Sequence, residues 1–178
     1  MKIVDNDHGC DSCGRSCKRD RDCCCSNSCQ KPGKSILNCG CGGVGPLPDN
    51  VVGGVATNMC NPIPVASVSI DTRCMECPKV LLHFTSQINL PIAADVTLNF
   101  MICRTTKCGC PQYVGGTFTF SAVAAALEAE SFSFQYCDCN PCPDCTTYTV
   151  SVEPSGAAIA GVTITNAMLT ALAVEDLC

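Results

Sequence analysis

Apolar and polar residues alternate along most of the chain beyond residue 60, which is typical of strands that bury one face. Six segments show this alternation: residues 80–85, 96–102, 117–121, 131–136, 147–152 and 161–165. Two further apolar segments, residues 65–71 and 168–174, flank the set and bring the number of expected strands to about eight. Turn residues such as Asn, Pro and Gly separate them. The pattern predicts an all-β protein, an antiparallel β-sandwich or jelly roll of about eight strands.

Two segments depart from the alternation. Residues 121–130 (SAVAAALEAE) combine an N-cap serine with good helix formers and predict one helical connection between strands. Residues 40–61 are rich in Gly, Pro and Asn and predict a loop or linker, with a short strand at residues 51–57.

The first 34 residues differ from the rest of the chain in composition and charge. They hold seven of the eleven Lys and Arg residues against five acids, whereas the remainder holds four bases and eleven acids. Between Val4 and Ile36 there is no Ile, Leu, Val, Met or aromatic residue, so this segment cannot bury a core of its own. The chain is therefore predicted to divide into a cysteine-rich connector arm, residues 1–34, and a β-sandwich body, residues 35–178. The basic arm is either a solvated tail or a segment that lies on the acidic body of another subunit.

Cysteine makes up 20 of the 178 residues, and a body of this size does not need ten disulfides to fold. The arm holds seven, an odd number, so at least one of them must pair outside the arm or stay free. The body cysteines are expected mostly at strand ends, where a thiol can reach another chain.

The segment CDCNPCPDC leaves two interpretations open. The thiolates of Cys137, Cys139, Cys142 and Cys145 could hold one zinc ion or an iron–sulfur cluster. Alternatively, these cysteines form disulfides that staple a turn stiffened by two prolines. The C-x-x-C pairs at residues 74–77 and 142–145 lack the helix that activates such pairs in thiol oxidoreductases, and neither is followed by the His of a haem attachment site.

Other features argue against several classes of protein. The two histidines have no identifiable catalytic partner, His83 is expected as a half-buried strand residue, and no nucleophile elbow, Walker or dinucleotide motif is present. We therefore expect no catalytic residues, no cofactor and no enzymatic activity. The net charge of −5 disfavours nucleic acid, and no apolar run approaches the length of a membrane span. The first thirty residues also contain no apolar stretch of a classical secretory signal.

Four stretches of the body carry a resemblance to a known family: KSILNCG (34–40), PIPVASVSIDTRC (62–74), SFSFQYCDCNPCPDC (131–145) and GVTITNAMLTALAV (161–174). With these, the chain resembles an uncharacterised family of cysteine-containing proteins from anaerobic, spore-forming clostridia. Its organisation is also similar to that of endospore appendage subunits, in which a jelly-roll body follows a cysteine-bearing N-terminal connector. This resemblance implies that the connector reaches into neighbouring subunits and forms intersubunit disulfides, while the longer connector of this chain leaves the pairing open.

The function expected from these features is that of a structural subunit that assembles with itself into a disulfide-cross-linked extracellular fibre, on the surface of spores. Release by lysis of the mother cell would reconcile the missing signal peptide with 20 cysteines. The alternatives are a thiolate metal-binding protein and a spore-coat protein that cross-links amorphously. The candidates for intersubunit disulfides are Cys10, Cys13, Cys17, Cys23, Cys24, Cys25, Cys29 and Cys178. The candidates for intrasubunit or acceptor disulfides are Cys39, Cys41, Cys60, Cys74, Cys77, Cys103, Cys108, Cys110, Cys137, Cys139, Cys142 and Cys145.

Overall fold

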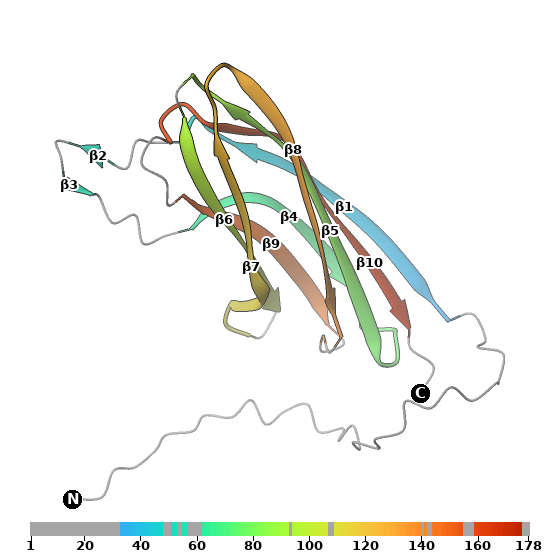
Figure 1. Cartoon of the computed structure of the whole chain (residues 1–178). Helices are drawn as coiled ribbons and strands as arrows, with labels where there is room; N and C mark the ends of the chain where they lie inside the picture. Colours follow the sequence, from blue (N-terminus) through green and yellow to red (C-terminus); the bar gives the residue numbers. More distant parts are fainter. Residues whose placement is uncertain are drawn as a thin grey trace, which may run out of the picture. The chain divides into compact units, whose positions relative to one another are not determined.

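Two four-stranded antiparallel sheets face each other in the computed structural model of the chain (Figure 1). The structure describes residues 33–47, 51–52, 55–56, 62–92, 94–106, 109–139, 141, 144–154 and 159–175. The strands are β1 (Ser35–Val44), β4 (Ile63–Asp71), β5 (Pro78–Leu90), β6 (Asp95–Thr106), β7 (Gln112–Val123), β8 (Glu128–Asp138), β9 (Cys145–Pro154) and β10 (Thr163–Glu175). Two further two-residue strands, β2 (Val51–Val52) and β3 (Val55–Ala56), pair with each other where the sequence predicts one short strand. The all-β prediction is confirmed.

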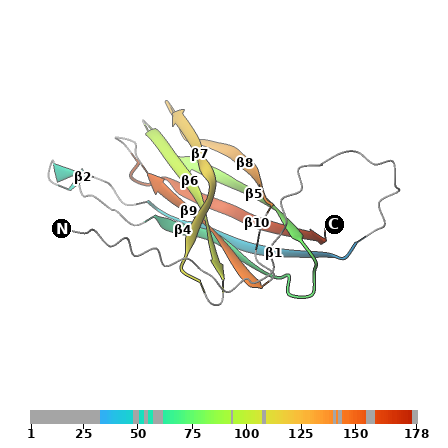
Figure 2. The ribbon, with the colours of Figure 1, turned by 90° about the horizontal axis from the view of Figure 1, so that it is seen from below.

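The strand order is that of a jelly roll. One sheet has the order β1-β10-β5-β8 and the other has the order β4-β9-β6-β7, so most consecutive strands lie in opposite sheets. Such crossing connections between two four-stranded sheets make a double Greek key. Seen from below, β1 lies beside β4 at one edge of the sandwich and β7 lies beside β8 at the other (Figure 2).

The alternating positions that predict strands form the core between the sheets. On β5 the even-numbered residues from Val80 to Leu90 are buried, and the odd-numbered residues are exposed or half-buried. All six phenylalanines of the chain lie in or against this core, and the Phe118 and Phe134 rings stack with their centroids 4.0 Å apart between β7 and β8. Aromatic packing therefore joins the sheets at this edge.

At the opposite edge, glycines let β1 and β4 of the two sheets approach closely. The loop predicted over residues 40–61 is wrong in part. Residues 40–44 continue β1, which pairs with β10. A Cβ atom at Gly40 would overlap the Ser67 carbonyl oxygen of β4, and one at Gly42 would overlap that of Val65. Glycine is required at these positions because the backbones of β1 and β4 approach closely. In a strand, glycine can therefore mark a close backbone approach and not a loop.

The predicted helix over residues 121–130 is also wrong. Residues 121–123 end β7 and pair with β6, and residues 128–130 begin β8 and pair with β5, with a short turn between them. One Ala-rich stretch is too short to offset the pairing of long strands. The two strands expected at residues 161–165 and 168–174 are one strand, β10, with an irregularity between Thr165 and Met168. The count of eight was therefore right because this split offsets the omission of β1.

No helix long and apolar enough to cross a bilayer occurs in the described part of the chain.

Candidate functional site

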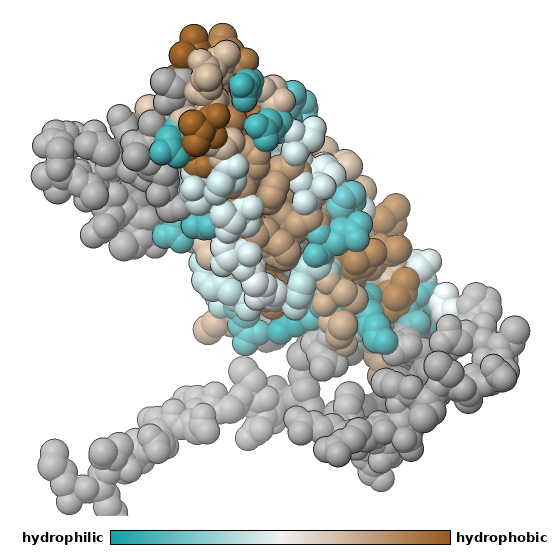
Figure 3. Space-filling model, in the orientation of Figure 1, coloured by the Kyte–Doolittle hydropathy of each residue, from teal (hydrophilic) through white to brown (hydrophobic). Residues whose placement is uncertain are grey.

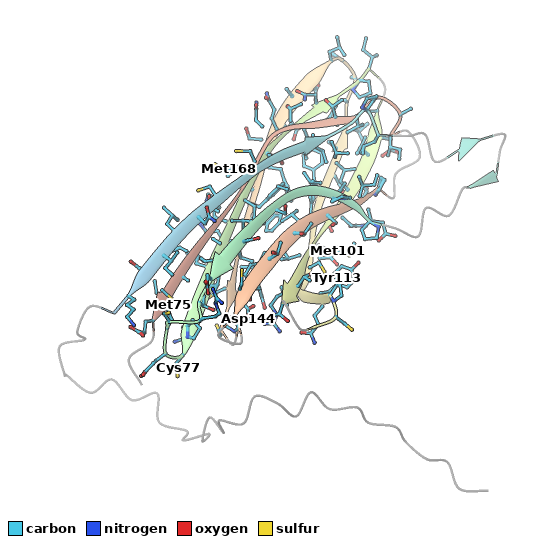
Figure 4. The ribbon with its side chains drawn as sticks, turned by 180° about the vertical axis from the view of Figure 1, so that it is seen from behind. Met75, Cys77, Met101, Tyr113, Asp144 and Met168 are labelled. Carbon is cyan, nitrogen blue, oxygen red and sulfur yellow. The ribbon has the colours of Figure 1, made fainter. Side chains whose placement is uncertain are left out.

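One end of the sandwich collects most of the described cysteines, and we call it the cysteine end. Here β4, β6, β8 and β10 finish, and β1, β5, β7 and β9 begin. The loops at this end span residues 72–77, 107–111 and 139–144. Two of these loops are bonded together, since the Thr72 amide donates to the Asp144 carbonyl oxygen at 3.0 Å. Figure 4 shows Met75, Cys77 and Asp144 at this end.

Six of the nine cysteines in the described residues lie at the cysteine end, which agrees with the expectation that body cysteines occupy strand ends. They are Cys74, Cys77, Cys110, Cys137, Cys139 and Cys145. The other three lie within strands. Cys39 and Cys41 are exposed in the middle of β1, and Cys103 is half-buried on β6. The free thiols in the structure include Cys39, Cys41, Cys74, Cys103, Cys110, Cys137, Cys139 and Cys145.

The remaining candidates fall outside the described residues. They include the entire predicted set of intersubunit cysteines, Cys10, Cys13, Cys17, Cys23, Cys24, Cys25, Cys29 and Cys178, and residues 1–32 of the predicted arm also lie outside the described residues. They also include Cys60, Cys108 and Cys142 of the predicted acceptor set.

A buried ion pair connects the two sheets next to these thiols. Asp138, the last residue of β8, is 4% exposed, and its Oδ2 atom accepts a hydrogen bond from Arg104 Nη1 of β6 at 2.9 Å. The hydroxyl of Tyr148 on β9 donates to the same oxygen at 2.9 Å. Arg104 also donates to Gln112 Oε1 at the start of β7. Burial, with the adjacent Asp138 charge, raises the pKa of Tyr148, so the hydroxyl stays a donor. The network fixes the end of β8 against the opposite sheet.

Cys137 and Cys139 lie on either side of Asp138 and form a close pair. Their Sγ atoms are 3.7 Å apart, and the Cys139 thiol donates toward the Cys137 sulfur and carbonyl oxygen. Both residues are exposed. Partial burial raises the pKa of the Cys137 thiol, and the hydrogen bond to Cys139 and the charge there add to the rise.

Glu175 holds together the strand ends and the 72–77 loop at the cysteine end. Its carboxylate accepts hydrogen bonds from the Glu76 amide at 2.8 Å and the Lys34 amide at 3.2 Å. These two hydrogen bonds, the Glu76 bond first, hold the pKa of Glu175 below its ordinary value. Lys34 Nζ in turn donates to the Cys74 carbonyl oxygen at 2.8 Å. The point where the predicted arm joins the body is thus tied to a cysteine-bearing loop.

The predicted four-thiolate site gains no support from the described residues, among which no three His, Cys, Asp or Glu side chains are grouped to hold a metal ion. Of its four members, Cys142 lies outside the described residues. His83 is half-buried in the middle of β5, opposite Thr170 and Gln135 on the neighbouring strands, as expected for a strand residue.

The far end of the sandwich has a different surface. Ile92, Val123 and Leu127 are 65%, 80% and 75% exposed in or beside the two connections 91–94 and 124–127. These connections are adjacent, because the Ala124 amide donates to the Ala94 carbonyl oxygen. Figure 3 shows apolar atoms gathered at this end. Asp95, Glu128 and Glu130 add negative charge to it. All four Lys and Arg residues of the described chain lie at the cysteine end, together with five acids: Asp71, Glu76, Asp138, Asp144 and Glu175.

Sequence reasoning missed the Asp138 network and Glu175. A signal for the network was present, since Asp138 shares the inward parity of Phe132, Phe134 and Tyr136. Arg104 likewise continues the inward series that ends with Phe100 and Ile102. Charges at inward positions of two strands predict a buried pair. Nothing in the pattern marks Glu175, because its role depends on which loop lies beside it.

Comparison with known proteins gives a family and little more. No curated protein matches the chain. Among solved structures, a chain described as "CBM4 structure and function" is 13% identical, with 64% of this chain and 72% of that chain covered. The TM-score of 0.22 is too low for this likeness to support any argument. The family model described as "Domain of unknown function (DUF4489)" matches residues 33–174, which span the sandwich from β1 to the end of β10. The chain belongs to this DUF4489 family.

Proposed function

We propose that the protein is a structural subunit that assembles with itself into a disulfide-cross-linked extracellular fibre. The observation that carries this proposal is the cysteine end, where three loops and the strand ends beside them bring exposed thiols to one end of a sandwich that has a core of its own. Because the fold does not require disulfides between these thiols, they are available for bonds to other chains.

The geometry of the sandwich supports a head-to-tail arrangement. The far end exposes apolar side chains and carries acids without a described base, whereas the cysteine end carries bases that can meet those acids. Unlike contacts that do not close on themselves produce filaments. The sandwich also has edge strands, which can pair with a strand from another chain.

The far end is a suitable contact for the basic arm of the next copy. Residues 1–34 carry seven Lys and Arg residues against five acids, and the described part of the far end carries acids without Lys or Arg. The alkyl stems of Lys and Arg can cover exposed Ile92, Val123 and Leu127 while their charges meet Asp95, Glu128 and Glu130. Fully extended, 34 residues span about 110 Å, so an arm that crosses this contact is long enough to carry its cysteines along the body of the other copy to the thiols there.

The location proposed for the fibre is the surface of spores, on the basis of the resemblance to a family from spore-forming clostridia and the similarity in organisation to endospore appendage subunits. Disulfides form and persist outside the cytosol. The proposal includes no catalytic activity, no cofactor and no partner other than further copies of the chain.

Gel electrophoresis under non-reducing and reducing conditions tests the proposal. Protein that has been exposed to air is expected to run as a ladder, or to remain in the well, and to collapse to a monomer when thiol reductant is added. A monomer of 18.6 kDa under both conditions, with zinc or iron found by elemental analysis, contradicts cross-linking and supports the metal-binding alternative. Negative-stain microscopy then separates an ordered fibre from amorphous aggregates.

A further inference from the structure

The Cys137–Cys139 pair has the geometry of a dithiol that can open and close. The two sulfurs are 3.7 Å apart, so a bond of about 2.05 Å requires the thiols to move closer. Residues two apart in an extended strand have Cα atoms about 6.6 Å apart, close to the upper limit of about 6.8 Å for a disulfide. A bond formed here is at the edge of the permitted geometry.

We propose that Cys137 and Cys139 form a reversible internal disulfide that acts as a thiol–disulfide exchange centre at the cysteine end. Exposed or strained disulfides are more easily reduced than structural ones, and they react readily with external thiols. Both cysteines are exposed, and β8 is an edge strand of its sheet, so an incoming thiol can reach either sulfur.

The chemistry needs an oxidant only for closing the pair. A disulfide oxidant such as oxidised glutathione takes two electrons from the two cysteine thiols and is reduced to two glutathione thiols, which also take up the two protons. An incoming thiolate then attacks one sulfur of the internal disulfide. A new intermolecular S–S bond forms, the Cys137–Cys139 bond breaks, and the second sulfur leaves as a thiolate. The number of disulfides does not change in this second step.

Asp138 gives the pair its position. Its side chain is 6% exposed and points into the sandwich, where it bonds to Arg104 and Tyr148. Successive side chains of a strand point to opposite faces, so this anchor directs Cys137 and Cys139 to the outside. Cys139 follows the last residue of β8, so the pairing of β8 with β5 does not fix it as it fixes Cys137.

The inference deepens the proposed function, on which it rests only for the identity of the incoming thiol, namely a cysteine of another copy. The exchange chemistry itself is tested with glutathione. A chain that exchanges but stays monomeric contradicts the fibre proposal alone. A chain that forms a ladder on the gel without an internal Cys137–Cys139 bond contradicts this inference alone.

The experiment uses the full chain, purified under reducing conditions and then treated with oxidised glutathione. Remaining thiols are alkylated, and the protein is digested with a protease that cleaves before aspartate. Cleavage before aspartate puts Cys137 and Cys139 on the separate fragments 95–137 and 138–143, and an internal disulfide links them. Fragment 95–137 also holds Cys103, Cys108 and Cys110, so tandem mass spectrometry of the linked pair assigns the bond to Cys137 and Cys139. The expected result is this linked product without bound glutathione, and its loss when reduced glutathione is added in excess.

Single variants identify the resolving thiol. In Cys139→Ser the linked product is expected to disappear, and glutathione should remain attached to Cys137 because no neighbouring thiol displaces it. Cys142→Ser, which alters the other cysteine of the same fragment, should leave the linked product unchanged. Alkylation of both thiols in the oxidised wild-type protein overturns the proposal, as does glutathione that stays bound to either of them.

Discussion

Asp138 and Asp71 show how burial decides the importance of an ion pair. Both carboxylates pair with an arginine at the cysteine end, Asp138 with Arg104 and Asp71 with Arg73. In the first pair the Arg104 side chain is 18% exposed and the Asp138 side chain 6%. In the second pair the Arg73 side chain is 62% exposed and the Asp71 side chain 47%. Water screens the exposed pair, and removal of one partner leaves little uncompensated. Removal of Asp138 leaves a guanidinium charge in a mostly buried place.

Asp138→Asn is therefore expected to lower the free energy of unfolding by about 3 kcal/mol, the low end of the range for a broken buried pair, because Arg104 keeps some access to solvent. The measurement is urea unfolding in reducing buffer, so that disulfides play no part. Asp71→Asn is the matched control and should unfold close to wild type, since its charge is at the surface. Equal losses in the two variants would mean that the Asp138 network does not stabilise the fold.

Side-chain parity made much of this predictable at the residue scale. The inward positions of β5, β6 and β8 follow the alternation in the sequence, and the same parity places Cys137 outside and Asp138 inside. Distances that depend on the conformation of a loop could not be predicted in this way. The 3.7 Å between Cys137 and Cys139 and the bonds to Glu175 depend on how a loop turns after its strand ends.

At the element scale, β1 is held where its glycines let it approach β4. Gly40→Ala would bring a Cβ atom into the Ser67 carbonyl oxygen, a backbone atom that cannot move aside as a flexible side chain can. We expect a loss of about 1–3 kcal/mol in the free energy of unfolding, as for other overpacked positions. Gly116→Ala on β7 is the control, because an added Cβ there has no neighbour within 4 Å. Chemical denaturation of both variants measures the difference, and a Gly40→Ala protein as stable as Gly116→Ala would refute the close approach.

A second prediction concerns the ends of β1 and β10, which Glu175 ties to the 72–77 loop. The pKa of Glu175 is lower in the folded chain than its ordinary value of 4.5. Ionised Glu175 therefore stabilises the fold at pH values above about 4.5, and this stabilisation is lost as the pH falls through the lowered folded pKa. Hydrogen bonds to Arg73 also lower the pKa of Asp71 to about 2, but that pair is exposed and screened by water, so Asp71 adds little to this pH dependence.

Glu175→Gln should consequently flatten part of the acid limb of a plot of unfolding free energy against pH, and it should reduce stability at neutral pH. Glu153→Gln, which changes an exposed glutamate of β9, is the control for the loss of one charge. Below about pH 5, the unfolding free energy of Glu175→Gln should change less steeply with pH than that of Glu153→Gln. Above about pH 5, the two curves should run parallel, with Glu175→Gln the less stable. Superimposable curves for the two variants would exclude a role for the Glu175 hydrogen bonds.

The elements themselves were predictable where the period of alternation was long, and not where local preference and pairing conflict. Residues 121–130 have helical preferences, yet both halves of the segment pair with long neighbouring strands. Residues 40–44 have the composition of a loop, yet they are a strand because a neighbouring backbone requires glycine. In both cases the tertiary partner decides, and the local sequence does not name that partner.

At the scale of the whole molecule, the sandwich has two unlike ends. It buries a hydrophobic core while eight of its described cysteines remain free thiols. The family match begins at residue 33, two residues before β1, so the family domain coincides with the sandwich. Residues 1–32 lie outside that unit. Folding and cross-linking are therefore expected to be separable properties of the chain.

Deletion of residues 1–30 tests this separation. The truncated chain keeps Lys34, whose amide and carbonyl oxygen bond to Glu175, and it keeps all of β1. Its thermal unfolding midpoint in reducing buffer should match that of the full chain, since no core residue is removed. Under oxidising conditions it should no longer form the polymer ladder, because the seven cysteines that would link successive copies are absent. Filaments that withstand heat and denaturant as well as those of the full chain would remove the arm from the mechanism and assign the cross-links to the cysteines that remain beyond residue 30.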